Sequence, residues 1–146
     1  MSTLTLTATA KLFVPTDVDT QQVVQAAAAK ARKRSFTEQV EFLLTTVGPR
    51  ITAAGAGLRD ARQLPAWRRG EVPREDVKLE RVAGMTEVTA AVMSDYDASV
   101  AASFLRGSQP ALDDACPMLM IREASLEDLP QVMSEVRGAV RAFLRG

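Results

Sequence analysis

One apolar stripe near the end of the chain constrains the fold more than any other feature of the sequence. Between residues 126 and 144, apolar side chains recur at intervals of three, three, one, three, four, three and one residues. This spacing places them along one face of an α-helix, whereas a half-buried strand would show strict alternation. We expect the helix to open at Ser125, with Pro130 near its first turn, and to bury the stripe in the core. The stripe consists of Leu126, Leu129, Val132, Met133, Val136, Val140, Phe143 and Leu144.

The rest of the chain also favours helices. Aromatic residues make up only 5% of the sequence, and Ala, Leu and Val supply most of its apolar content of 47%. Ala and Leu are strong helix formers, and Gly, Pro and capping residues divide the chain into segments. An interior proline breaks the helical hydrogen-bond ladder, so the segment that contains Pro65 should kink or restart near Leu64. The sequence predicts an all-α fold with further helices over 20–33, 36–47, 51–56, 59–69, 75–93, 95–106 and 117–123.

Residues 1–18 differ from the remainder. Thr alternates with Leu and Ala there, which is typical of a strand, but a lone strand has no pairing partner in a helical protein. We expect either a disordered tail or an extended arm that pairs with another copy. The predicted organisation is this arm, an N-terminal helix over 19–34, a helix-turn-helix-like bundle over 35–93 and a small helical domain over 94–146.

Several classes of function lack the residues they need. The chain contains no histidine and one cysteine, Cys116, so the commonest general base and zinc ligand are missing and no disulfide can form within it. No Gly-rich phosphate loop is present, and the carboxylates occur as short pairs typical of solvated loops. We therefore expect no catalytic residues, no metal site and no cofactor. No segment has the length of a membrane span or the pattern of a signal peptide, which predicts a cytoplasmic protein.

Charge is unevenly distributed along a chain whose net charge is zero. Residues 30–74 carry ten basic and four acidic side chains, a net charge of +6, whereas residues 77–146 carry a net charge of −3. Within the basic part, two short helices joined by a glycine-containing turn form a helix-turn-helix outline. The pattern is compatible with two structures, a DNA-binding element whose basic residues contact phosphates or bases in a major groove, and a helical hairpin with a solvated basic face. The candidate DNA-binding residues are Arg59, Arg62, Arg68 and Arg69.

Two sequence runs resemble a known family. Residues 58–73 read LRDARQLPAWRRGEVP and are similar to the second helix of an Xre-type helix-turn-helix, including its W-x-x-G-E-x-P ending. Residues 104–121 read FLRGSQPALDDACPMLMI, where a helix ends in a bulky pair, a P-x-L loop follows and a proline opens the next short helix. The order of these features over residues 36–146 resembles the Xre/MbcA/ParS antitoxins. The chain departs from the family pattern at Gly55, where a bulky residue is usual, and at Pro65.

This resemblance implies a function through binding. Members of the family pair with a RES-domain toxin, an enzyme that destroys NAD, by covering its active-site cleft with the C-terminal domain. They are typically homodimers, and many bind their own operator DNA. The implied toxin-binding residues are Arg106, Asp113, Arg137, Arg141, Phe143, Leu144 and Arg145. For the three arginines of the last helix, a simple solvated face is an equal alternative. Two other functions remain open, namely a stand-alone DNA-binding transcriptional regulator and a helical adaptor of a larger assembly.

Overall fold

The described part of the chain is all-helical, as the sequence predicts. The structure is a computed structural model that describes residues 17–146. Across this range there are eight α-helices, two short 3-10 helices and no β-strand, and one isolated antiparallel bridge joins Gln109 to Ala115. The expected N-terminal arm lies mostly outside the described residues. The elements are α2 (Asp17–Lys33), α3 (Phe36–Thr46), α4 (Pro49–Ala56), η2 (Ala61–Gln63), α5 (Leu64–Arg68), α6 (Asp76–Val92), α7 (Ala98–Arg106), η3 (Pro110–Leu112), α8 (Pro117–Glu123) and α9 (Leu129–Arg145).

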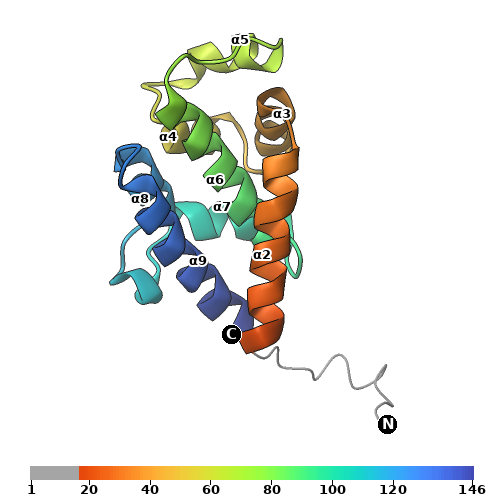
Figure 1. Ribbon diagram of the computed structural model, residues 1–146, viewed down its shortest axis with the longest axis vertical. Coiled ribbons are helices and arrows are strands. Elements are labelled where there is room, and N and C mark those ends of the chain that lie inside the picture. The colour runs from red at the N-terminus through yellow and green to blue at the C-terminus, as the bar shows by residue number, and fades with distance from the viewer. Residues whose placement is uncertain (1–16) are drawn as a thin grey trace.

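Helix α6 forms the centre of the molecule. Figure 1 shows it between α2 on one side and α8 and α9 on the other, with α3, α4 and α5 at one end. Residues 82–89 are buried all round the helix, which is typical of a helix with neighbours on every face. Its buried hydroxyl groups are satisfied within the helix, since Thr86 donates to the carbonyl of Val82 and Thr89 donates to that of Met85.

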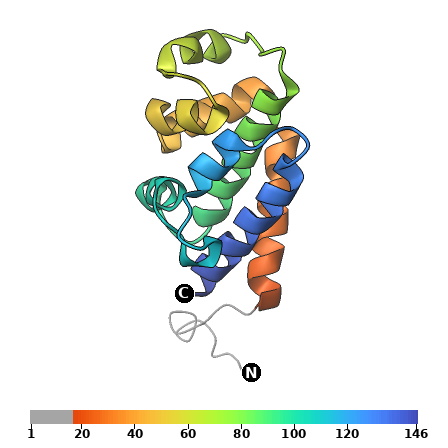
Figure 2. The ribbon, with the colours of Figure 1, turned by 90° about the vertical axis from the view of Figure 1, so that its left-hand side faces the viewer.

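One hydrophobic core runs through all of these helices. It includes Val24 of α2, Leu43 of α3, Trp67 of α5, Phe104 of α7 and Val136 of α9. The ranges 19–34, 35–93 and 94–146 therefore share a single core. Figure 2 shows α2 and α9 lying side by side, so the first and last described helices are neighbours.

Local signals set most helix boundaries where the sequence predicts them. Ser35 and Glu38 form a capping box at the start of α3, in which the Ser35 hydroxyl accepts from the Glu38 amide at 3.1 Å. This arrangement, chiefly the bonds from Ser35, lowers the pKa of the Glu38 carboxyl. Pro117 opens α8 as predicted. The predicted restart near Leu64 is confirmed, because a 3-10 turn ends at Gln63 and α5 begins with Pro65 in its first turn.

The start of the last helix differs from the prediction. Helix α9 begins at Leu129 instead of Ser125, and the Leu126 side chain is 46% exposed instead of facing the core. The reason is Pro130, because a helix that included residue 126 would push the proline ring against the Leu126 carbonyl. The chain instead turns, with the Ser125 hydroxyl accepting from the Asp128 amide at 3.1 Å. Helix α2 begins at Asp17, three residues before the predicted start at residue 20.

Candidate functional site

The four arginines predicted to bind DNA are exposed, but two of them are held by carboxylates of the same chain. Arg62 donates through Nε and Nη2 to Asp60 Oδ2 at 2.9 and 2.7 Å. Arg68 donates through the same two nitrogens to the Glu41 carboxylate at 2.6 and 3.0 Å. The hydrogen bonds from Arg62 lower the pKa of the Asp60 carboxyl. DNA phosphates would have to compete with these two carboxylates for both arginines.

The element expected to read DNA is short and anchored. Its α-helical part covers five residues, and the buried Trp67 ring makes a T-shaped contact with the Phe36 ring, at a centroid distance of 5.1 Å. Pro65 separates this part from the preceding 3-10 turn. Arg59 and Arg69 contact no carboxylate among the described residues, so they are the free basic groups of the predicted set.

Gly55 has a packing role between α4 and α6. A Cβ atom at this position would lie only 2.4 Å from Cε of Met85 in α6. Met85 is fully buried and occupies the space that a bulky residue at position 55 would need. Helices α4 and α6 therefore approach closely, and the Met85 side chain of α6 fills the space beside Gly55.

The C-terminal motif forms a closed turn between α7 and α8. The Gln109 amide donates to the Ala115 carbonyl at 3.1 Å, and the Asp114 amide donates back to the Gln109 carbonyl at 3.0 Å. Asp113 and Asp114 both adopt left-handed backbone conformations, with φ of 53° and 65°, which Asp tolerates better than most residues. The turn leaves Asp113 exposed, and Arg106 is exposed at the end of α7.

Arg137, one of the predicted toxin-binding residues, has a partner within the chain. Its Nε and Nη2 atoms donate to the two carboxylate oxygens of Glu87, with an Nη2–Oε1 distance of 3.0 Å. Glu87 is only 1% exposed, so the pair ties α9 to the buried face of α6. The hydrogen bonds to Glu87 raise the pKa of the Arg137 guanidinium. Its Nε and Nη2 atoms therefore serve to attach α9 to α6.

Phe143 and Leu144, also predicted to contact the toxin, lie within the protein's own packing. Leu144 is 4% exposed and belongs to the hydrophobic core. The half-buried Phe143 ring lies 5.1 Å from the ring of Phe104 and 5.3 Å from that of Tyr96, measured between centroids. Both side chains therefore pack against their own chain. Arg145 is exposed, and Arg141 is half-buried.

An arginine that the sequence analysis did not single out joins two helix ends. Arg81 of α6 donates to the carbonyls of Ala56 at 3.4 Å, Ile121 at 3.2 Å and Ala124 at 2.9 Å. These carbonyls lie at the C-terminal ends of α4 and α8, where the helix dipole favours a cation. Burial, followed by the nearby charge of Arg122, lowers the pKa of Arg81. No sequence signal reveals these bonds, because the partners are 25 to 43 residues apart.

Arg122 makes a similar connection from α8 and borders a surface hollow. Its Nη1 atom donates to the carbonyls of Ala54 and Leu58, each at 2.9 Å. The hollow between α4 and α8 has a volume of about 550 Å³ and is called the α4–α8 hollow below. Figure 2 shows these two helices next to each other on the face turned toward the viewer. The lining residues are Arg50, Ala53, Ala54, Leu58, Arg59, Asp60, Ala61, Leu119 and Arg122.

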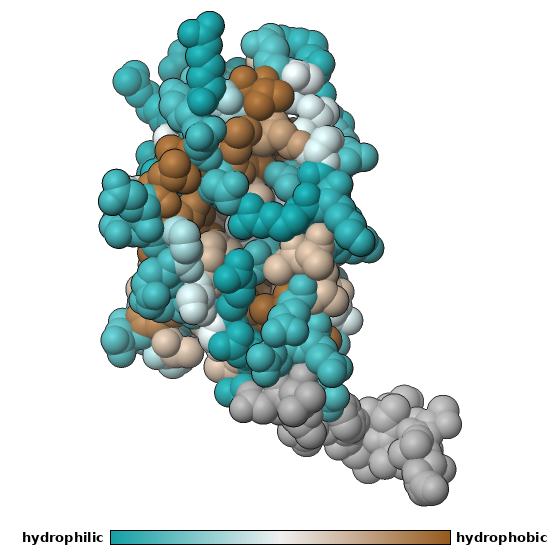
Figure 3. Space-filling model, in the orientation of Figure 1, coloured by the Kyte–Doolittle hydropathy of each residue, from teal (hydrophilic) through white to brown (hydrophobic). Residues whose placement is uncertain are grey.

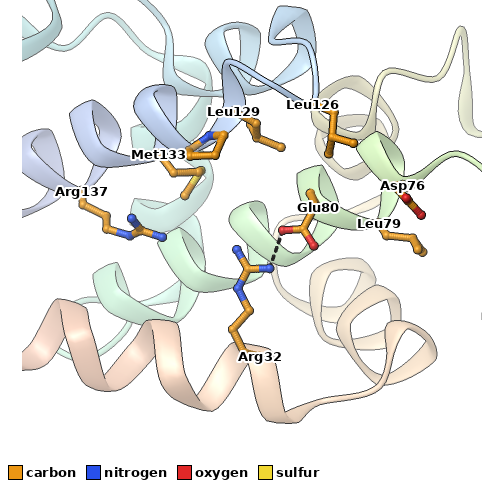
Figure 4. Close-up of a pocket in the computed structure, with 9 residues that line it drawn as sticks. Arg32, Asp76, Leu79, Glu80, Leu126, Leu129, Met133 and Arg137 are labelled. Atoms are coloured by element: carbon orange, nitrogen blue, oxygen red, sulfur yellow. Dashed lines mark hydrogen bonds and ion pairs between the residues drawn. The ribbon is translucent and has the colours of Figure 1, made fainter.

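A second hollow of about 410 Å³ lies among α2, α6 and the start of α9. Figure 4 shows Leu126, Leu129 and Met133 along one wall, with Arg32 of α2 reaching Glu80 of α6 across the opposite side. The distance between Arg32 Nη1 and Glu80 Oε1 is 2.6 Å. The ion pair uses one nitrogen of Arg32 and joins the N-terminal helix to the central one.

The described residues contain no group of three or more metal-ligating side chains, and none of their helices has the length and apolar character of a membrane span. Comparison with protein families, with curated proteins and with solved structures found no match to this chain.

Proposed function

We propose that this chain is an antitoxin-like binding protein that captures and neutralises a RES-type toxin, an enzyme that degrades NAD. The observation that supports the proposal most is the order of elements in the C-terminal half. Helix α7 ends in the bulky pair Phe104 and Leu105, the closed turn follows, Pro117 opens α8 and α9 completes the unit. This is the order of features that the resemblance to the Xre/MbcA/ParS antitoxins rests on.

The residues proposed to meet the toxin are the predicted ones whose side chains reach the surface. Arg106 is exposed at the end of α7 and Asp113 is exposed within the closed turn, and Arg141 and Arg145 follow along α9. Arginine is enriched at interface hot spots. An exposed pair of opposite charges at a hydrogen-bonded turn suits a partner surface that carries the complementary charges. Arg137 and Leu144 serve this surface indirectly, by fixing α9 on the core.

The test is coexpression of the tagged chain with a RES-domain protein, taken from the neighbouring reading frame if that frame encodes one. We expect the two to copurify and the complex to lose the NAD consumption that the free toxin shows. The paired variant Arg106→Glu with Asp113→Arg should restore NAD consumption. Arg74→Glu is the matched control, an exposed charge reversal in the segment before α6 that should leave inhibition intact. Normal inhibition by the paired variant would place the contact elsewhere, and an active toxin in the presence of the wild-type chain would contradict the function itself.

The proposal includes a homodimer that acts in the cytoplasm and represses its own operon. Arg59 and Arg69 supply the free basic groups for operator DNA, while Arg62 and Arg68 would first have to leave Asp60 and Glu41. A stand-alone transcriptional regulator and a helical adaptor are the alternatives. A specific promoter complex without any RES-domain partner would favour the regulator, and the lack of both would favour the adaptor.

A further inference from the structure

The α4–α8 hollow combines an apolar floor with a cationic rim. Its floor is formed by the small or aliphatic side chains of Ala53, Ala54, Leu58 and Ala61. Leu119 stands at its edge on α8 and is 45% exposed, which makes it one of the large apolar side chains most accessible to water. In Figure 3 hydrophobic residues reach the surface between polar ones on the left-hand side, where α4 and α8 lie in Figure 1.

The rim carries a strong excess of positive charge. Arg50, Arg59 and Arg122 line the hollow, and the one acidic residue that lines it is Asp60. The Asp60 carboxylate is already bound by Arg62, so it neutralises none of the three rim arginines. No ion pair or hydrogen bond within residues 17–146 engages the guanidinium group of Arg50 or Arg59. Two cations therefore face solvent beside an apolar surface.

Arg122 is held in position before any partner arrives. Its Nη1 atom bridges the carbonyls of Ala54 and Leu58 at the end of α4, and the guanidinium is thereby fixed over the hollow. Its other N–H groups make no hydrogen bond among the described residues. A partner that binds a pre-ordered arginine loses less side-chain entropy than one that must order it. The planar group also suits bidentate binding of a carboxylate.

We propose that the α4–α8 hollow binds an acidic, amphipathic segment of a partner protein, with its apolar side chains on Leu119, Ala54 and Ala61 and its carboxylates on the rim arginines. An apolar floor distinguishes this site from a phosphate-binding surface, since phosphates need donors and gain nothing from an exposed leucine. The proposal uses none of the residues assigned to the toxin, so it does not depend on toxin binding. It shares Arg59 with the proposed operator contact, and DNA is therefore included as a competitor below.

The experiment uses the full chain and a dye-labelled helical peptide of Leu and Glu, with Leu at positions i, i+3, i+4 and i+7. Fluorescence anisotropy measures its affinity. Two control peptides replace Leu by Ser or Glu by Lys, and a DNA duplex of random sequence serves as a competitor. Leu119→Ser and Arg50→Glu test the two halves of the site. Arg50 lies in the first turn of α4, where a glutamate is compatible with the helix, so the fold should survive.

Leu126→Ser is the matched control, because Leu126 is 46% exposed and lies outside the hollow. We expect each site variant to weaken peptide binding at least about tenfold, while Leu126→Ser leaves it unchanged and both control peptides fail to bind. Circular dichroism verifies that each variant is folded. The proposal is overturned if the Leu and Glu peptide does not bind at millimolar concentration, or if Leu119→Ser binds it normally. Displacement of the peptide by DNA, with dependence on Arg50 but not on Leu119, would identify a nucleic-acid surface and also overturn it.

Discussion

Arg137 of α9 and Glu87 of α6 form a bidentate ion pair in which the carboxylate is almost wholly buried. A buried charge is tolerated only when it is paired and hydrogen-bonded, and Arg137 supplies both requirements. The pair therefore links the last helix to the central helix, and loss of either partner would leave the other charge unpaired, which lowers the free energy of unfolding.

Replacing Arg137 should destabilise the protein more than its partial exposure suggests. In Arg137→Met, Glu87 would keep its buried position without a counterion, which costs about 3 kcal/mol in the free energy of unfolding. Urea denaturation measures this loss. Arg141→Met, one turn further along α9, should change stability by no more than about 0.5 kcal/mol. The double variant Glu87→Met with Arg137→Met should recover much of the loss, and equal losses in the single and double variants would argue against this explanation.

The end of α9 should be essential for folding. Leu144→Ala removes a buried side chain and should cost about 2–5 kcal/mol, as core truncations typically do. Deletion of residues 142–146 also removes the Phe143 ring from its contacts with Phe104 and Tyr96, so we expect loss of the folded state. Thermal unfolding followed by circular dichroism measures both effects. The control is Leu126→Ala, an exposed Leu that should be nearly neutral; an unaltered melting temperature in the deletion variant would contradict the observed packing.

Gly55 should tolerate no bulky residue while Met85 is present. Gly55→Val forces the Met85 side chain out of its buried site, and such overpacking typically costs about 1–3 kcal/mol. Adding Met85→Ala should relieve part of the cost. Gly138→Ala in the middle of α9 is the control. Gly138 is half-buried, but an added Cβ would lie no closer than 3.7 Å to Arg141, so the change should stabilise the helix by up to about 1 kcal/mol. Denaturant midpoints compare the three variants, and a stable Gly55→Val would show that α4 and α6 separate easily.

Binding to DNA of random sequence should become more dependent on salt when Arg62 and Arg68 no longer form ion pairs with Asp60 and Glu41. Asp60→Asn frees Arg62 and keeps a capping side chain, and Glu41→Gln frees Arg68. Two additional phosphate contacts should steepen the log–log salt dependence of affinity by about 1.8. Fluorescence anisotropy at several salt concentrations measures the slope. Glu135→Gln changes the charge elsewhere on the surface and should leave the slope unaltered, and an unchanged slope in the double variant would mean that Arg62 and Arg68 do not reach phosphates.

Stability should fall on acidification, partly through Asp97. Hydrogen bonds from Ser99, and then from the Val100 amide, lower the pKa of the Asp97 carboxyl at the start of α7. The unfolded state therefore binds the proton more readily than the folded state, so this contribution is complete above the ordinary pKa and is lost as pH falls through the folded value. Asp97→Asn keeps the cap but removes the titration, and its urea midpoint should drop less between pH 6 and pH 3. Identical drops in the two proteins would refute the assignment.

Local chemistry explains why much of the fold follows from the sequence alone. The capping box of Ser35 and Glu38, the restart at Leu64 and the start of α8 at Pro117 depend on residues within a few positions of each other. The all-α class follows from helical spacing and helix-forming composition, which are equally local. The difference between the predicted and the observed start of α9 also has a local cause, because Pro130 excludes residue 126 from the helix.

Tertiary packing alone decided which charged and apolar residues remain available to a partner. Arg137 forms its ion pair with Glu87, 50 residues away in the sequence, and Arg122 donates a hydrogen bond to the carbonyl of Ala54, 68 residues away. The sequence places Phe143 and Leu144 on an apolar stripe, but only the packing of α9 shows that their own chain covers them. Periodicity reports which side of a helix is apolar, whereas the group that covers that side is set by long-range contacts. The α4–α8 hollow arises in the same way, from two helices that are distant in the sequence and joined by arginines at their ends.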